Sequence, residues 1–127
     1  MNKFTPVQTS LAPAAVGPYS QALVFNTMIF CSGQIGIDPQ TNVLVEGIEN
    51  QTHQVMKNVS AVLTAANSSL NFVLKTTIYL SDMKNYAVVN EIYGSYFSDH
   101  RPARATVEVA RLPKNALIEI DAIACTH

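Results

Sequence analysis

The chain has 127 residues, of which 48% are hydrophobic and 13% charged, and its formal net charge is −1. This length and apolar content predict one domain over residues 1–127, and the small charged fraction predicts apolar surface that is buried between copies in a homo-oligomer. The pI near 6.2 and the scattered Lys and Arg residues provide no basic face, which counts against nucleic acid as a partner.

The N-terminal segment is predicted to be a short strand followed by a loop. Residues 2–8 are expected at a sheet edge, because Pro6 cannot donate to a ladder. The loop ends at Tyr19, which follows a Gly-Pro pair whose backbone is restricted. Tyr19 either anchors the loop on the core or faces a site, and both readings stay open.

Two β-rich runs, residues 22–25 and 28–32, are separated by two residues and predict a hairpin. Ser32 ends the second run and is followed by the glycine-containing segment 33–36, where a ligand could approach the backbone closely. A nucleophilic role for Ser32 is not favoured, because G-x-S-x-G is absent and no base lies nearby in sequence.

The middle of the chain is predicted to contain two helices around a strand. After a turn at 38–42, apolar residues recur at helical spacing over 47–66. The β-branched and aromatic run 72–80 indicates a buried strand, and Asp82 is a suitable N-cap for a helix over 83–97.

Asn90 lies on the apolar side of that second helix, whose stripe comprises Tyr86, Val89, Tyr93 and Phe97. An unpaired buried amide would cost about 1–3 kcal/mol, so Asn90 is expected to be hydrogen-bonded. It either ties down a neighbouring loop or faces a site.

The last part of the chain is predicted to form two strands in which apolar and charged residues alternate. The apolar face of the first comprises Ala105, Val107 and Val109, and that of the second Ile118, Ile120, Ala122 and Ala124. The element order β-β-β-α-β-α-β-β predicts an α+β fold with both helices on one face of a mixed sheet. The other face would then bear the polar set of Arg104, Thr106, Glu108, Glu119 and Asp121, and would be available to neighbouring subunits.

Arg104 and Glu119 are the candidate catalytic pair. An arginine fork suits a carboxylate, and a glutamate can orient or deprotonate water for attack on a small 2-oxo acid or its nitrogen analogue. An ordinary ion pair is the alternative. If the last two strands formed a simple hairpin, Glu119 would lie ~13 Å from the partner position of Arg104. Either the strands are not direct partners, or the site spans two subunits.

Other classes of site lack support in the sequence. His53, His100 and His127 are far apart, so no metal is predicted. Cys31 and Cys125 lack the paired spacing of a redox motif and are expected to be free thiols. No apolar run could cross a bilayer and no signal-peptide core is evident, so we expect a cytoplasmic protein without membrane contact.

Four motifs occur in order along the chain: AAVGPYSQA, CSGQIG, VNEIY and RPARATVEVARLPKNALIEIDAIA. In these motifs the chain resembles the Rid family, also called the YjgF/YER057c/UK114 family. The resemblance implies a chorismate-mutase-like homotrimer with sites in the clefts between subunits. It also implies cofactor-free hydrolysis of 2-iminobutanoate or 2-iminopropanoate to the 2-oxo acid and ammonia, with a functional link to the pyridoxal-phosphate dehydratases that release such imines.

The resemblance also implies roles for individual residues. Arg104 of PAR would bind the substrate carboxylate, and Glu119 of IEI would position water. Tyr19 would act as a lid, with Ser32 and Asn90 lining the pocket. Thr106, a pocket position where many members have cysteine, leaves substrate preference open. Two alternatives remain: an endoribonuclease that inhibits translation, and a non-catalytic regulator that binds small acids and does not need Glu119.

Overall fold

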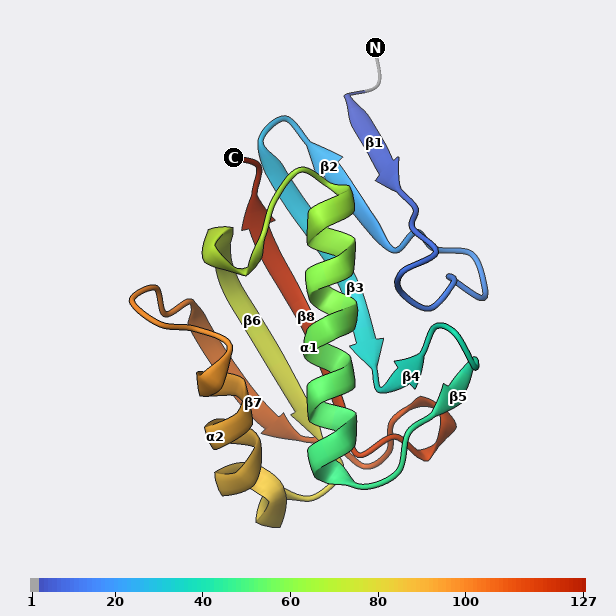
Figure 1. The fold of residues 1–127 in the computed structure, drawn as a ribbon, viewed down its shortest axis with the longest axis vertical. Helices are drawn as coiled ribbons and strands as arrows, with labels where there is room; N and C mark the ends of the chain where they lie inside the picture. Colours follow the sequence, from blue (N-terminus) through green and yellow to red (C-terminus); the bar gives the residue numbers. More distant parts are fainter. Residues whose placement is uncertain (1–2) are drawn as a thin grey trace.

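A six-stranded mixed sheet, covered on one face by two helices, forms the structure of residues 3–127 in the computed structural model (Figure 1). The sheet strands are β1 (Phe4–Val7), β2 (Ala22–Phe25), β3 (Met28–Ile35), β6 (Val73–Leu80), β7 (Ala103–Glu108) and β8 (Ile118–Cys125), in the order β1-β2-β3-β8-β6-β7. A separate ribbon pairs β4 (Ile37–Asp38) with β5 (Val43–Leu44). The helices are α1 (Ile48–Ala65) and α2 (Tyr86–Ser95), with 3-10 turns η1 (Leu70–Phe72), η2 (Met83–Asn85) and η3 (Pro113–Asn115). The predicted α+β class is confirmed.

The placement of both helices on one face follows from two crossover connections. The chain leaves β3, forms α1 and enters β6, and then passes through α2 into β7, which pairs with β6 in parallel. Both steps move across the sheet in the same direction. Because such crossovers are right-handed, successive steps in one direction place their helices on the same side. β8 then inserts antiparallel between β3 and β6.

The N-terminal strands agree with the sequence prediction. β1 lies at a sheet edge, as expected from Pro6, and of the predicted span 2–8 the residue Asn2 lies outside the described part. The β2–β3 hairpin is confirmed. β3 extends to Ile35, beyond the predicted end, and its register against β8 shifts between Cys31 and Gln34. This bulge places Gly33 on the irregular part of the strand.

The core lies between the sheet and α1. Val55, Val59, Val62 and Leu63 of α1 are all buried against the strands, as their helical spacing predicts. The second helix begins later than predicted. Asp82 does act as a cap, but its side chain accepts from the Lys84 N–H of η2, and α2 starts only at Tyr86.

One prediction about β7 is wrong. Arg104 pairs with the buried Thr76 and Thr106 pairs with the buried Ile78, so Arg104, Thr106 and Glu108 lie on the helix-covered face. They do not share a face with Glu119 and Asp121, which alternate with the buried residues of β8. The physical reason is the local cover: α2 presents tyrosines and an asparagine to β7, so polar side chains are accommodated there, and the small apolar residues of β7 turn to the open face.

β6 lies between β7 and β8, so these two strands are not direct partners. The simple hairpin considered from the sequence does not form. Of the two explanations for the long separation of Arg104 and Glu119, the structure therefore supports the first, and it places the two residues on opposite faces of the sheet.

Two polar residues of α1 connect the helix to the strand ends. Asn58 is fully buried and donates to the carbonyls of Ile35 and Ile37, at 3.1 and 2.9 Å, where β3 ends. Gln51 accepts from the Leu117 N–H at 2.8 Å, immediately before β8. α1 therefore fixes the end of β3 and the start of β8, the strand that carries Glu119.

Two further predictions concern the cysteines and the possible metal ligands. Cys31 and Cys125 are free thiols, as predicted, and burial raises the pKa of Cys31 to about 12. Within residues 3–127 no group of His, Cys, Asp or Glu is arranged to hold a metal ion. In the same span no helix has the length and apolar character needed to cross a membrane.

Candidate functional site

The predicted site residues fall into two groups on opposite sides of the sheet. Arg104 and Asn90 belong to one group, between β7 and α2. Glu119 belongs to the other, beside the end of β3 on the open face, together with Ser32 and the loop that carries Tyr19. A single chain does not bring the two groups together.

Arg104 is held by one face of α2. Tyr86, Asn90 and Tyr93 occupy positions i, i+4 and i+7 of the helix, so their side chains project from the same side. The Arg104 guanidinium lies 5.8 Å from the Tyr86 ring centroid and 5.1 Å from that of Tyr93, and it donates to the Tyr86 hydroxyl at 3.1 Å. These cation–π contacts fix the cation without neutralising it.

Tyr93 connects the side chains around Arg104 to the sheet. Its hydroxyl lies 2.7 Å from the Thr76 hydroxyl in the core, and Thr76 is the register partner of Arg104. The Tyr93 ring also packs against Phe97, with centroids 4.9 Å apart. The orientation of Tyr93, and therefore that of Arg104, is set by buried contacts.

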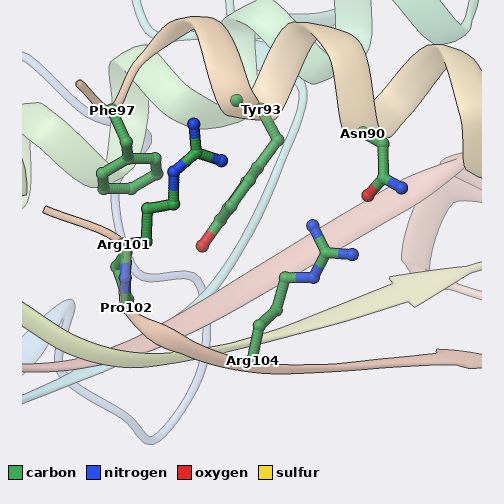
Figure 2. A pocket seen from close by; sticks show the side chains of 7 residues that line it. Asn90, Tyr93, Phe97, Arg101, Pro102 and Arg104 are labelled. Atoms are coloured by element: carbon green, nitrogen blue, oxygen red, sulfur yellow. The ribbon is translucent and has the colours of Figure 1, made fainter. Parts of the chain in front are cut away.

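A cavity of about 400 Å³ opens beside the Arg104 guanidinium. Its walls are Asn90, Tyr93, Gly94, Phe97, Arg101, Pro102 and Arg104. Figure 2 shows the Tyr93 ring projecting between the Arg101 and Arg104 side chains, with both guanidinium groups turned toward α2. The cavity is therefore positively charged and has aromatic walls.

Asn90 and Arg104 both act on the Tyr86 hydroxyl. The interaction with the Asn90 amide and then the Arg104 charge lower the pKa of that hydroxyl. Asn90 also lines the cavity. Of the two readings of Asn90, its position favours the one that faces a site.

Thr106 lies further along β7, on the same face as Arg104. Its hydroxyl oxygen is buried and has no hydrogen-bond partner within residues 3–127. It is not among the residues that line the Arg104 cavity.

Glu119 lies against the bulge of β3. A Cβ built at Gly33 would come within 2.8 Å of the Glu119 Cδ and closer still to its Oε2, so only glycine leaves room for this carboxylate. Ser32 donates from its hydroxyl to the Ser20 carbonyl at 2.6 Å, which ties the bulge to the loop carrying Tyr19. Tyr19 is 53% exposed, so it does not anchor that loop in the core.

The Glu119 carboxyl is half-buried and has a second acid as a neighbour. Burial, and then the charge of Asp121, raise the pKa of Glu119. Asp121 itself accepts from the Tyr79 hydroxyl at 3.1 Å. A carboxyl whose pKa moves toward neutrality is better suited to accept and return a proton near neutral pH.

Several of these residues were not identified as site residues from the sequence. Tyr86 and Tyr93 were assigned to the apolar stripe of the helix, whereas they enclose Arg104. The available signal was the asparagine between two tyrosines at i, i+4 and i+7, which marks a polar, aromatic face. Arg101 also lines the cavity, and no sequence pattern identifies it as a site residue.

A family model described as "Endoribonuclease L-PSP" matches residues 9–126 of the chain. A RutC family protein of Pyrococcus horikoshii is 53% identical, with 91% of this chain and 93% of that protein covered. The 2-iminobutanoate/2-iminopropanoate deaminase of Mus musculus is 46% identical, with coverages of 93% and 88%. The chloroplastic Reactive Intermediate Deaminase A of Arabidopsis thaliana is 50% identical, with coverages of 93% and 64%.

Solved structures have the same fold. The Rid family protein YyfA of Yersinia pestis superposes with a TM-score of 0.95 at 49% identity, covering 97% of this chain and 99% of that one. Escherichia coli TdcF, solved with bound serine, superposes with a TM-score of 0.93 at 37% identity, with the same coverages.

Proposed function

The chain belongs to the Rid family, whose model carries the description endoribonuclease L-PSP, and from this membership we propose that it is a hydrolytic deaminase of reactive 2-imino acids. The proposed substrates are 2-iminobutanoate and 2-iminopropanoate, which would yield the 2-oxo acid and ammonia without a cofactor. Two relatives at 46% and 47% identity are named 2-iminobutanoate/2-iminopropanoate deaminase, and one at 50% is named Reactive Intermediate Deaminase A; these names support the proposal. Because pyridoxal-phosphate dehydratases release these imines, we expect a functional link to them.

The observation that carries the proposal concerns the contacts of the Arg104 side chain. Its guanidinium borders a cavity, is oriented by two aromatic rings, and makes no ion pair within residues 3–127, where the one ion pair joins Lys84 and Asp82. A rigid arginine fork without a carboxylate partner is suited to bind the carboxylate of a small acid.

The proposed chemistry needs one general base. Glu119 would take a proton from water as the water oxygen bonds to C2 of the imine, and the proton would pass to the nitrogen. The carbinolamine then loses ammonia as its hydroxyl gives up a proton and the C2 carbonyl forms. Atoms balance as imine plus water to oxo acid plus ammonia, and no electrons are exchanged with another group. The raised pKa of Glu119 supports this role.

The complete site would lie between subunits. Arg104 and Glu119 occupy opposite faces of one sheet, so in this proposal a second copy supplies the missing group. The open face carries exposed apolar side chains that a trimer would cover, namely Phe4, Leu23, Phe25, Phe30 and Val107. Light scattering that gives the mass of one 13.8 kDa chain at working concentration would contradict the homotrimer.

The direct test is a coupled assay. A threonine dehydratase generates the imine, and semicarbazide traps whatever is not hydrolysed. We expect the protein to suppress semicarbazone formation, Arg104→Ala to lose this effect, and Arg111→Ala, an exposed arginine away from the cavity, to retain it. Unchanged semicarbazone formation with the parent protein would refute the deaminase assignment.

The description of the family model supports an endoribonuclease as the second candidate. The net charge of −1 weighs against it, because phosphate contacts dominate the affinity of proteins for RNA. RNA cleavage by nuclease-free protein, lost in Arg104→Ala, would favour this candidate. If the parent protein hydrolyses no imine, Arg104→Ala abolishes 2-oxo acid binding and Glu119→Gln leaves that binding unchanged, the protein is a non-catalytic acid-binding regulator.

A further inference from the structure

We infer that the Arg104 cavity recognises short dicarboxylic 2-imino acids, with Arg101 binding the distal carboxylate. This inference rests on the proposed deaminase chemistry and extends its substrates from the monocarboxylic imines named above to dicarboxylic ones. Imines of aspartate or glutamate have the required chemistry: a carboxylate next to C2 for Arg104, a short apolar chain, and a second carboxylate for Arg101.

The observation behind it is a pair of arginines on one cavity wall. Arg101 and Arg104 both line the same space of about 400 Å³, and no acidic residue is among its walls. Within residues 3–127, Arg101 has no hydrogen bond or ion pair, and the single hydrogen bond of the Arg104 guanidinium goes to a neutral hydroxyl. Two cations near one another repel, so an occupant with two negative charges would be favoured over one with a single charge.

The two arginine side chains flank one aromatic ring of the cavity. Arg104 belongs to β7, and Arg101 lies just before that strand begins at Ala103. Pro102 lies between them and restricts the backbone of that segment. Both side chains turn toward α2 on either side of Tyr93, so a ligand that reaches both guanidinium groups would lie against its ring (Figure 2).

The wall between the arginines suits an apolar linker. Tyr93 and Phe97 provide ring surfaces, and at Gly94 there is open space where a side chain would start. The methylene chain of a dicarboxylate would contact these groups while each carboxylate receives charge-assisted hydrogen bonds. A monocarboxylic imine would leave Arg101 unused.

Calorimetric binding of two 2-oxo acids, the products of the proposed reaction, tests this selectivity. We expect the parent protein to bind 2-oxoglutarate about tenfold more tightly than 2-oxobutanoate, a ratio typical of one added charge-assisted contact. In Arg101→Gln the ratio should fall to about one, and in Arg101→Lys part of it should remain. Arg111→Gln, which removes an arginine outside the cavity, should leave the ratio at the parent value.

The same ratio is then measured for catalysis, with imines produced by amino-acid oxidases from glutamate and from alanine. A higher kcat/KM for the glutamate imine that disappears in Arg101→Gln supports the inference. Equal binding of both oxo acids by the parent overturns it, as does an Arg101→Gln variant whose only change is a lower Tm, which would give Arg101 a structural role.

The outcomes for the two proposals are separable. Hydrolysis of both imines without a preference refutes dicarboxylate selectivity and leaves the deaminase intact. Selective binding of 2-oxoglutarate without hydrolysis of either imine refutes the deaminase and supports dicarboxylate recognition at Arg101.

Discussion

The Arg104 and Glu119 sides of the sheet differ in what surrounds the charged group. Arg104 is enclosed by aromatic side chains of α2 from its own chain, and the Tyr93 hydroxyl bonds to Thr76 in the core. Glu119 lies on the open face, where it is accommodated by the absence of a side chain at Gly33 and lies close enough to Asp121 for that charge to raise its pKa. Arg104 is thus oriented by side chains of its own helix-covered face, whereas Glu119 has no helix over it.

The two residues therefore illustrate two ways in which a fold can position a charged side chain. Arg104 is positioned by packing, so its geometry should be present in each folded chain. Glu119 is positioned by strand register and a backbone bulge, and its cover would come from another subunit. The predictions below test this division, from the largest expected effect to the smallest.

The largest effect is expected from mixing two inactive variants. Arg104→Ala and Glu119→Gln should each lower kcat/KM at least about a hundredfold, which corresponds to ~2.7 kcal/mol of transition-state stabilisation. If each site uses Arg104 of one chain and Glu119 of another, co-expressed variants should regain activity, because some mixed sites contain both native residues. The semicarbazone assay measures this recovery.

The control for this experiment is a mixture of Arg104→Ala with Arg104→Gln, which cannot rebuild a native site. Native mass spectrometry establishes that mixed assemblies have formed. If mixed assemblies of Arg104→Ala and Glu119→Gln form but regain no activity, then Arg104 and Glu119 do not act together across one subunit interface.

A methyl group at Gly33 should disturb only the Glu119 side. In Gly33→Ala the Cβ would overlap the Glu119 carboxylate, so that side chain must move, and we expect kcat/KM to fall at least about tenfold, ~1.4 kcal/mol. In a Glu119→Gln background the same substitution should cause little further loss. Equal losses in both backgrounds would indicate a general defect of the bulge and not a displaced carboxylate.

The fall of kcat/KM at low pH should follow the protonation of Glu119. Its pKa is raised by burial and by Asp121, and the carboxylate is the active form, so kcat/KM should fall as pH drops through a value above the usual glutamate range. Asp121→Asn removes the neighbouring charge, so this fall should shift to lower pH. Glu46→Gln, an exposed acid outside this cluster, should not move it.

The smallest effects concern two threonines on the helix-covered face. Thr106→Val removes a buried hydroxyl that has no partner within residues 3–127, and should raise the free energy of unfolding by roughly 1 kcal/mol. Thr76→Val leaves the Tyr93 hydroxyl without its contact and should lower it by about 1–3 kcal/mol. Urea titrations of both variants measure these changes. A loss of stability in Thr106→Val would indicate a partner for that hydroxyl in the assembled protein.

The sequence predicted the element order and β8 well. In β8, Ile118, Ile120 and Ala122 alternate with acidic residues, and these apolar side chains do pack on the core. β8 is a central strand and α1 covers one of its faces, so the apolar side chains of β8 are buried only on the face beneath α1. The candidate pair and Asn90 stay predictions, and their functional roles come from the family resemblance.

The same alternation misled at β7, because that strand lies at the sheet edge beneath α2. Ala105 and Val107 look like core residues, yet they face the open side, where their cover would be another chain. The alternation of apolar and polar residues distinguishes the two faces of a strand, but it does not show which face a helix covers. The bulge at Gly33 was also beyond prediction, because it depends on the register of β3 against β8.

The Gln51 side chain has a consequence for the motions of the protein. Its bond to the Leu117 N–H protects an amide that lies outside any strand, just before β8. Hydrogen exchange at Leu117 should therefore be as slow as exchange of α1 amides, since release of that proton requires the helix to separate from the sheet. On the timescale of local opening, the start of β8 and the nearby Glu119 thus move with α1 on the far side of the sheet, and not with the loops that flank them.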